Sequence, residues 1–583
     1  NNDNNNDNNN DNNNNDNNDN NDNNDNISNS QSSPQSSATL RESSPDELAL
    51  IININNEPNT YKQAVNSTDK DNWLKSMKLE IDELELQNTW NLVELPPNRT
   101  YLRGRWVYKI KTDLDNNIIK YKSRWVVKGF DQILGLDYLE TFSATCRPES
   151  YRLIFILAMS NKWKLLQYDV KNAFVHANID ADIYVEQPIG LERYHNKNSN
   201  KYDLVKNVPK FESDNKNKPE LLKLYCKLNK ALYGLKQSPR LWYKHLLEAL
   251  TKLGFEVLPY DEAIFIHNKL KIIIICHVDD LIFTGPNNNE ISNIVKELTK
   301  TIKIEYISEV HQFLGMEIKL DYKEQSVHIN QNKYLNSLLE RFNKKDLNPV
   351  TTPVEAGVRL DKATDTANKN DLQLYQQQVG SLIYLATKTR PDIAYAVNRC
   401  ARYMSNPDLT HFRALDRIWK YLNKYPNIGT YYLCNKSFLE LLGYTDADWG
   451  GDINSRKSTS GFLFLVNNCI ISWSSMLQKT VALSSCEAEY MAFKEAIKEI
   501  LYLHNLVSYF NNFLNNNKTL IPKLLTDSES ALKLANNPEF HKRSKHIDIT
   551  YHFIRNEIAN NKLSLLYVNT TVQLADGFTK ALD

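Results

Sequence analysis

Two apolar runs separated by a pair of acids constrain this chain more than any other stretch. Residues 272–276 and 281–285 are rich in large apolar side chains, and Asp279 and Asp280 stand between them. Such runs are typical of buried strands, and a short polar break between two of them predicts a hairpin. Two carboxylates at the tip of a buried hairpin are costly unless a cation such as Mg²⁺ neutralises them. The alternative is a turn that is merely acidic, because Asp is common in turns.

Length and composition point to a multidomain globular protein. The chain has 583 residues, more than one ordinary core would hold, and 41% of them are hydrophobic and 24% charged. Lys plus Arg and Asp plus Glu number 70 each, so net charge does not indicate a nucleic-acid binder and only local clusters of cations can. Seven scattered cysteines without zinc spacing predict reduced thiols. No apolar run approaches the length of a membrane span, so we expect no membrane partner.

Four segments differ in their sequence pattern. Residues 1–46 begin with a tract of only Asn and Asp and continue rich in Ser, which predicts a disordered linker. Residues 70–330 contain the hairpin and other short strands, residues 331–437 are mostly helical, and residues 438–583 have three strands followed by alternating helices and strands. That last order predicts a compact mixed sheet, separate from what precedes it and ended by a helix. Because the first residue is Asn rather than Met, we expect a piece of a longer product.

A second predicted hairpin carries a row of cations. Lys109 and Lys111 alternate with apolar residues on its first strand, and Lys120, Lys122 and Arg124 have the same spacing on its second. Side chains two residues apart point to the same face of a strand, so we expect the five cations on one face. An ordinary solvated face is the alternative, but five like charges without an intervening acid favour contact with phosphate.

A third acid can join the pair at the first hairpin. Asp169 lies near the end of the apolar stretch 165–170, which predicts a strand. Nucleotidyl transfer uses two metal ions, one to activate the 3′-hydroxyl and one to steady the leaving pyrophosphate. Because Mg²⁺ binds carboxylate oxygens and keeps several waters, Asp169 together with Asp279 and Asp280 would be enough to hold two ions.

Four further acids lie on four elements of the C-terminal segment. They are Asp446, Glu489, Asp527 and Asp576. If they converge, they form a second two-metal site, at which water rather than a 3′-hydroxyl attacks phosphorus. Acids at the ends of elements are also common as caps, which is the alternative for Asp527 and Asp576 taken singly. Glu487 in place of Glu489, and Asp448 in place of Asp446, stay open as ligands.

Consecutive stretches of the chain resemble the motifs of a copia-type LTR retrotransposon reverse transcriptase, in the same order and spacing. They are residues 121–124, 128–130, 167–174, 232–242, 277–280 and 313–318. The C-terminal segment resembles the RNase H domain that follows the polymerase in the Pol polyprotein of that family. The resemblance implies a multidomain α+β and α/β fold. Its parts would be the fingers and palm of a right-hand polymerase in 70–330, a thumb or connection-like region in 331–437, and an RNase H-like mixed-sheet domain in 438–583.

Individual residues gain roles from this resemblance. The acids would be the catalytic metal ligands: Asp169, Asp279 and Asp280 for polymerisation, and Asp446, Glu489, Asp527 and Asp576 for RNA cleavage. Phe174 would be a steric gate that rejects a ribose 2′-hydroxyl, although a plain core aromatic is the alternative. Gln237 would lie against the incoming nucleotide. Arg124, with Lys122 beside it, would meet the triphosphate, since a guanidinium fork suits phosphate.

The implied activity is RNA-directed DNA synthesis, with RNase H cleavage of the RNA strand of the hybrid, and two Mg²⁺ or Mn²⁺ ions at each active site. Implied partners are an RNA template, a DNA primer or RNA–DNA hybrid, dNTPs, and the integrase and capsid proteins of the same element. The implied location is intracellular, in a cytoplasmic virus-like particle, in the nucleus, or in both. The alternative is an inactive remnant that only binds nucleic acid. His277, where the family usually has Tyr or Phe, and Gly577, where a bulky aliphatic is usual, leave that alternative open.

Overall fold

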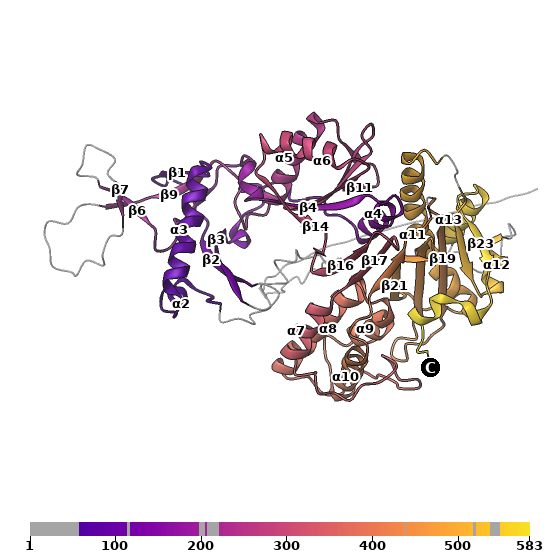
Figure 1. Cartoon of the computed structure of the whole chain (residues 1–583). Helices are drawn as coiled ribbons and strands as arrows, with labels where there is room; N and C mark the ends of the chain where they lie inside the picture. The colour runs from indigo at the N-terminus through magenta and orange to yellow at the C-terminus, as the bar shows by residue number, and fades with distance from the viewer. Residues whose placement is uncertain are drawn as a thin grey trace, which may run out of the picture. The chain divides into compact units, whose positions relative to one another are not determined.

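The computed structural model describes residues 57–112, 117–196, 204–206, 221–436, 438–516, 520–536 and 548–582 (Figure 1). The linker predicted for residues 1–46 lies outside these ranges. Within them, no helix combines the length and the apolar character that crossing a bilayer requires.

The first described part is a helix packed on a two-stranded ribbon. Helix α3 (Lys70–Leu86) packs on β3 (Ile118–Val127), which pairs with β2 (Gly104–Thr112). The helix buries an apolar stripe, Trp73, Met77, Ile81 and Leu84. Smaller elements around it are α2 (Tyr61–Val65), β1 (Trp90–Val93), β5 (Tyr184–Val185), β6 (Arg193–Asn196), β7 (Leu204–Lys206), β8 (Leu221–Lys223) and β9 (Tyr225–Leu228).

The ribbon confirms the predicted row of cations. Lys109 lies opposite Lys122, and Lys111 lies opposite Lys120, in the β2–β3 ladder. Arg124 is two residues further along the same strand as Lys122, and therefore on the same face. Like charges placed directly opposite each other destabilise a ribbon, so this face favours an anionic partner.

A six-stranded antiparallel sheet follows, in the order β10–β11–β12–β13–β4–β14. Its strands are β10 (Glu256–Leu258), β11 (Asp261–His267), β12 (Ile272–His277), β13 (Asp280–Gly285), β4 (Lys164–Val170) and β14 (Ile304–Glu309). The predicted hairpin is β12–β13, and the strand predicted around Asp169 is β4. Both expectations are therefore confirmed.

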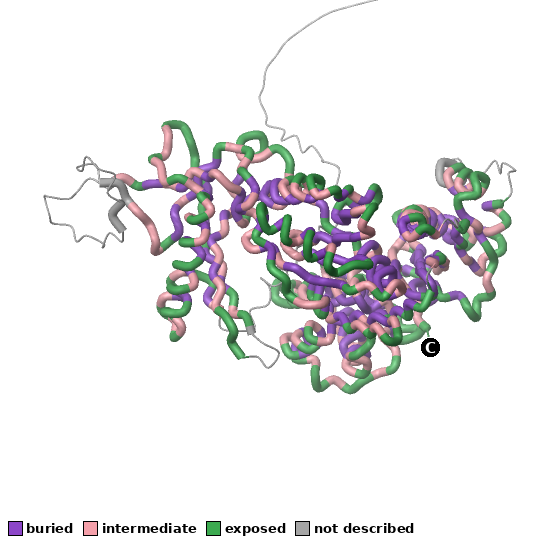
Figure 2. The backbone as a smooth tube through the Cα atoms, turned by 45° about the horizontal axis from the view of Figure 1, so that its top comes forward, coloured by how far each residue is buried: buried purple, intermediate pink, exposed green. Residues whose placement is uncertain are grey.

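This sheet is buried on both faces, which explains the unbroken isoleucine run. Ile272 and Ile274 belong to a core with α5 (Ser238–Lys252) and α6 (Asn288–Thr299). Ile273 and Ile275 belong to a second core with α4 (Pro148–Ser160). A strand covered on both faces needs an apolar side chain at every position. Figure 2 shows the buried segments gathered in the interior and the exposed segments around them.

The helices expected between residues 331 and 437 enclose a core around Trp419. They are α7 (Asn332–Arg341), α8 (Lys369–Lys388), α9 (Ala394–Ala401) and α10 (Leu409–Lys424). The region then ends in a strand, β18 (Thr430–Leu433), which pairs with β17 (Ser326–Asn330). The other strands of that sheet are β15 (Gln312–Phe313) and β16 (Met316–Asp321).

The C-terminal mixed sheet has the order β21–β20–β19–β22–β23, with β22 parallel to both of its neighbours. Its strands are β19 (Leu441–Asp448), β20 (Thr459–Val466), β21 (Cys469–Leu477), β22 (Lys523–Thr526) and β23 (Ser564–Tyr567), and its helices are α11 (Ser485–Phe513), α12 (Glu529–Asn536) and α13 (Asp548–Ala559). The predicted final helix is wrong. Two 3₁₀ segments, η4 (Thr570–Val572) and η5 (Leu574–Phe578), stand in its place, because β-branched residues and Gly577 have low helix propensity.

The C-terminal sheet packs against the parts of the chain that precede it. One hydrophobic cluster contains Phe155 of α4, Phe313 of β15 and Phe464 of β20. Arg152 of α4, only 2% exposed, donates to the carbonyl of Ile471 at 2.7 Å and to the carbonyls of Thr387 and Lys388 at 3.0 and 2.8 Å. This buried cation on α4 donates to carbonyls of two other segments, the end of α8 and strand β21, and so links the three parts of the chain.

Candidate active sites

The β12–β13 turn brings its acid pair next to Asp169. Asp280 lies opposite Asp169 in the β13–β4 ladder, and the backbone N–H of Val170 donates to the carbonyl of Asp279 at 2.9 Å. Directly opposed residues of antiparallel strands point to the same face, with Cβ atoms roughly 5 Å apart. The structure therefore gathers the three acids predicted for the first site at the ends of two neighbouring strands.

A lysine lies beside these acids. Lys171 Nζ is 2.5 Å from Oδ2 of Asp169 and 3.3 Å from Oε2 of Glu305. Burial lowers the pKa of Lys171, but its hydrogen bonds and charge attraction to the two carboxylates outweigh burial and raise the pKa overall. The Lys171 ammonium therefore neutralises Asp169, and a divalent cation would have to compete with it for this carboxylate. Sequence reasoning missed Lys171, whose only signal is its position two residues after the acid.

Val278, which precedes the acid pair, has a strained backbone. Its φ is +58°, a left-handed conformation that costs a β-branched residue roughly 1–3 kcal/mol. Its carbonyl accepts a hydrogen bond of 2.7 Å from Nε1 of Trp242 on α5. Strain of this kind persists only where the surroundings hold it. Sequence reasoning assigned Trp242 no role of its own.

The cations expected to meet phosphate lie near these acids. The Arg124 guanidinium is over the ring of Tyr233, 5.0 Å from its centroid. Burial, together with Arg124 and Lys111, lowers the pKa of Lys122 to about 8. Burial raises the pKa of Glu80 to about 7, although Arg124 and Lys122 act against it. Arg124, Lys122 and Lys111 thus lie close together, with the buried Glu80 beside them.

Phe174 and Gln237 occupy different environments. Phe174 is half-buried on the 3₁₀ segment η2 (Ala173–His176), and its ring meets that of Tyr233 edge-on at 4.9 Å. Gln237 is fully buried; its side chain accepts from Gln132 at 3.0 Å and donates to the carbonyl of Asp137 at 2.7 Å. The Gln237 amide is thus engaged by protein groups, and a contact with a nucleotide requires these bonds to open. Its substrate role stays a prediction.

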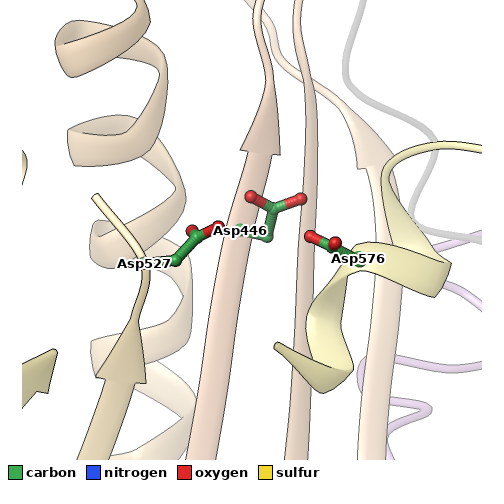
Figure 3. Close-up of side chains that lie close together, drawn as sticks. All are labelled: Asp446, Asp527 and Asp576. Carbon is green, nitrogen blue, oxygen red and sulfur yellow. The ribbon is translucent and has the colours of Figure 1, made fainter. Parts of the chain in front are cut away.

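The second site is a tight cluster of carboxylates. Asp446 on β19, Asp527 just after β22 and Asp576 on η5 point toward one another (Figure 3), with ligand oxygens all within 4.8 Å. The parallel pairing of β19 and β22 places the first two acids at the same edge of the sheet. No other three His, Cys, Asp or Glu side chains in the described ranges are gathered this closely. The three acids of the first site are therefore further apart than those of the second.

Glu489 on α11 faces the same cluster. Burial raises its pKa to about 9, with repulsion from Asp446 and Asp527 adding to the rise. Burial likewise raises the pKa of Asp446 to about 6, with repulsion from Asp576 and Asp527 adding to it. Oε2 of Glu489 and Oδ1 of Asp576 are buried without a hydrogen-bond partner. Buried carboxylate oxygens that lack a donor are what a hard divalent cation binds, so the residues fit Mg²⁺ or Mn²⁺.

The geometry favours Asp446 over Asp448 and Glu489 over Glu487 as ligands. Glu487 accepts a hydrogen bond from the backbone N–H of Leu483 at 2.8 Å, so it caps the start of α11 rather than facing the cluster. Asp448 is outside the set of mutually close oxygens. These four acids are the natural choice for a second metal site, and their ligand role stays a prediction.

Two residues that follow Asp576 in the sequence, Thr579 and Lys580, contact the cluster. The Thr579 hydroxyl donates to Oδ2 of Asp446, and Lys580 Nζ is 2.8 Å from Oδ2 of Asp576. Thr579 is fully buried, whereas the Lys580 side chain is 46% exposed. Sequence reasoning missed both; the signal was their place three and four residues after an acid, a spacing that returns a side chain to the same side of a helical turn.

Comparison with known proteins assigns this architecture to a family. Residues 87–209 and 201–356 match the family described as "Reverse transcriptase (RNA-dependent DNA polymerase)". The Retrovirus-related Pol polyprotein from transposon TNT 1-94 of Nicotiana tabacum is 35% identical over 542 residues, which cover 91% of this chain and 38% of the relative. The corresponding polyprotein from transposon RE1 of Arabidopsis thaliana is 36% identical over 538 residues, covering 92% of this chain and 34% of the relative.

These matches cover most of this chain but only part of each relative. The chain spans little more than a third of the length of the curated relatives it matches. Among solved structures, the alignment with LC11-RNase H1 in complex with an RNA/DNA hybrid covers 24% of this chain and 94% of the LC11-RNase H1 chain. The sequence identity is 14% and the TM-score is 0.19. A TM-score this low does not establish a shared fold.

Proposed function

Because the chain belongs to the reverse transcriptase family carried by copia-type retrotransposon Pol polyproteins, we propose that it is an RNA-directed DNA polymerase followed by a ribonuclease H. It copies retrotransposon RNA into DNA and degrades the RNA strand of the resulting hybrid. One observation carries the proposal: a second, metal-competent carboxylate cluster follows the reverse transcriptase segment in the same chain. A nuclease of this kind would remove the RNA template once it has been copied.

In the polymerase site, Asp169, Asp279 and Asp280 hold the metal ions. Bound divalent cations supply activation of the primer 3′-hydroxyl and neutralisation of the leaving pyrophosphate. The chain provides the remaining charge, since Arg124 and Lys122 attract the triphosphate from the cationic ribbon. Phe174 limits the space beside the sugar and so favours a deoxyribonucleotide, and Gln237 lies against the nucleotide once its bonds to the neighbouring loop open.

In the nuclease site, Asp446, Glu489, Asp527 and Asp576 hold the ions. The raised pKa values of Glu489 and Asp446 mean that ions and protons compete for the same oxygens. Lys580, on the exposed side of the cluster, is placed to meet a phosphate of the RNA strand. Further proposed partners are dNTPs, primer and template, and the integrase and capsid proteins of the element. The alternative of an inactive remnant gains no support, because all seven acids are present and grouped.

Primer extension and hybrid cleavage test the two halves separately. The purified chain should extend a DNA primer on an RNA template in Mg²⁺, and Asp279→Asn combined with Asp280→Asn should abolish extension while hybrid cleavage persists. Asp446→Asn should have the opposite effect, removing cleavage and leaving synthesis intact, so each variant serves as the control for the other. A chain that extends no primer in Mg²⁺ or Mn²⁺ would refute the polymerase half.

A further inference from the structure

Two backbone carbonyls of the turn that carries Asp279 and Asp280 accept hydrogen bonds from other parts of the chain. The Asp279 carbonyl accepts from the N–H of Val170, at the end of β4. The Val278 carbonyl accepts from the indole Nε1 of Trp242 at 2.7 Å. The first bond links the turn to the strand of Asp169, and the second links it to helix α5.

Trp242 is well placed to act as a fixed donor. Its side chain is 1% exposed and belongs to the core between α5 and the central sheet. Its ring centroid lies 6.0 Å from that of His176 and 6.2 Å from that of His245. An indole N–H can only donate, so the bond to the Val278 carbonyl has a single possible direction. A rigid, enclosed aromatic therefore sets where this carbonyl can lie.

The backbone of Val278 explains why such a donor is needed. A β-branched residue avoids φ values near +58°, the value observed here. Without the indole donor, the carbonyl keeps only the long, weak contact from the Cys276 thiol at 3.9 Å, and the turn gains freedom to relax toward a right-handed conformation. Relaxation would rotate the next peptide and move the carboxylates of Asp279 and Asp280 away from Asp169.

We propose that Trp242 is a positioning residue for the first metal site, holding Val278 in its left-handed conformation so that the acid pair faces Asp169. The consequence for DNA synthesis rests on the proposed polymerase function. Helix α5 begins directly after Gln237, so the same rigid helix connects the expected nucleotide contact to the metal-binding turn. Trp242 acts through the turn and touches no substrate.

Metal binding provides the primary test. Trp242→Phe keeps an aromatic ring and removes the donor, and Trp419→Phe is the matched control, because Trp419 is also fully buried and donates through Nε1 to Gln378 at 2.8 Å. Both are made in an Asp446→Asn chain, which weakens the second site, and Mn²⁺ binding is measured by calorimetry. Loss of one buried hydrogen bond predicts about tenfold weaker binding for Trp242→Phe and less than about twofold change for Trp419→Phe.

Kinetics separate positioning from a general loss of structure. Trp242→Phe should lower kcat about tenfold with Mg²⁺ and less with Mn²⁺, because Mg²⁺ demands stricter geometry. The KM for dNTP should change little, since the triphosphate contacts lie on the cationic ribbon. In a chain that retains Asp446, hybrid cleavage should be unchanged and reports that the fold is intact.

A double-mutant cycle decides between positioning and plain packing. Glycine adopts positive φ freely, so in a Val278→Gly background the Trp242→Phe change should alter Mn²⁺ affinity by less than about twofold. A Trp242→Phe chain that folds only together with Val278→Gly would support the proposal equally. Equal Mn²⁺ affinity with and without Trp242→Phe, or failure to fold in both backgrounds, would overturn it. If the parent chain extends no primer yet Trp242→Phe weakens Mn²⁺ binding, the polymerase function fails and the positioning role stands.

Discussion

Asp446→Asn should reverse its effect on stability when Mg²⁺ is added. A pH of about 7.5 lies roughly three units above the ordinary pKa of a glutamate, 4.5, and below the pKa of about 9 that Glu489 has in the fold. An acid with a raised pKa costs stability that grows as pH rises from the unfolded value toward the folded one. Three units correspond to about 4 kcal/mol, an upper bound, because burial is the largest cause and only repulsion is relieved by the substitution.

The expected gain without metal is therefore a fraction of that bound, about 1–2 kcal/mol. Asparagine is close to aspartate in shape, and its carbonyl can still accept from the Thr579 hydroxyl, so packing should be preserved. Mg²⁺ at about 100 times its dissociation constant stabilises the wild-type chain by about 2.7 kcal/mol. The variant should lose most of this gain. Asp446→Asn should thus be the more stable protein in EDTA, and the wild-type chain should be the more stable one in Mg²⁺.

Differential scanning calorimetry of both full-length proteins, in EDTA and in saturating Mg²⁺, measures this reversal. Asp448→Asn is the matched control, because Asp448 lies on the same strand but outside the cluster, and it should keep the full Mg²⁺ response. If the wild-type chain is already more stable than Asp446→Asn in EDTA, repulsion among the acids is not the dominant interaction. Equal Mg²⁺ stabilisation of both proteins would show that Asp446 is not a ligand.

Three further outcomes follow from groups described above. Lys122 loses its proton as pH rises through about 8, so the KM for dNTP should rise above that pH in the wild-type chain and stay flat in Lys122→Arg; a parallel rise in both would contradict the assigned contact. Glu80 costs stability as pH rises from 4.5 to about 7, so Glu80→Gln should raise the free energy of unfolding by up to about 3 kcal/mol at pH 8 and by little near pH 4, as urea titrations at both pH values would show. Arg152→Met should lower the stability by roughly 1–3 kcal/mol for each carbonyl left unsatisfied, and calorimetry that shows no loss would mean that water replaces the guanidinium.

Local pattern was enough to predict much of the fold. The isoleucine run, the alternating lysines of the ribbon and the stripe of α3 each reflect burial on one or two faces, which periodicity encodes directly. The order of strands and helices after residue 438 was also visible, except for the last element. There, β-branched residues and Gly577 lower the helix propensity, and the chain forms 3₁₀ segments instead.

The candidate sites were predictable only where the acids themselves carry the signal. Their convergence depends on strand order, which places Asp280 opposite Asp169 and Asp446 beside Asp527. Partners such as Trp242 and Thr579 reach the acids through tertiary contacts between distant parts of the chain, and no local spacing encodes such contacts. The burial of Gln237 was likewise invisible, because a polar residue at the start of a helix is usually exposed.

The guanidinium of Arg152, which donates to carbonyls of both α8 and β21, bears on how elements of this kind can diversify. Exchange of the part after residue 438 between two lineages would bring in a foreign β21 whose carbonyl at position 471 must still meet a buried cation from the other parent. A mismatched chimera would strand that charge in an apolar setting. Recombination should therefore preserve this joint, and hybrid elements should carry the parts on both sides of it from one ancestor.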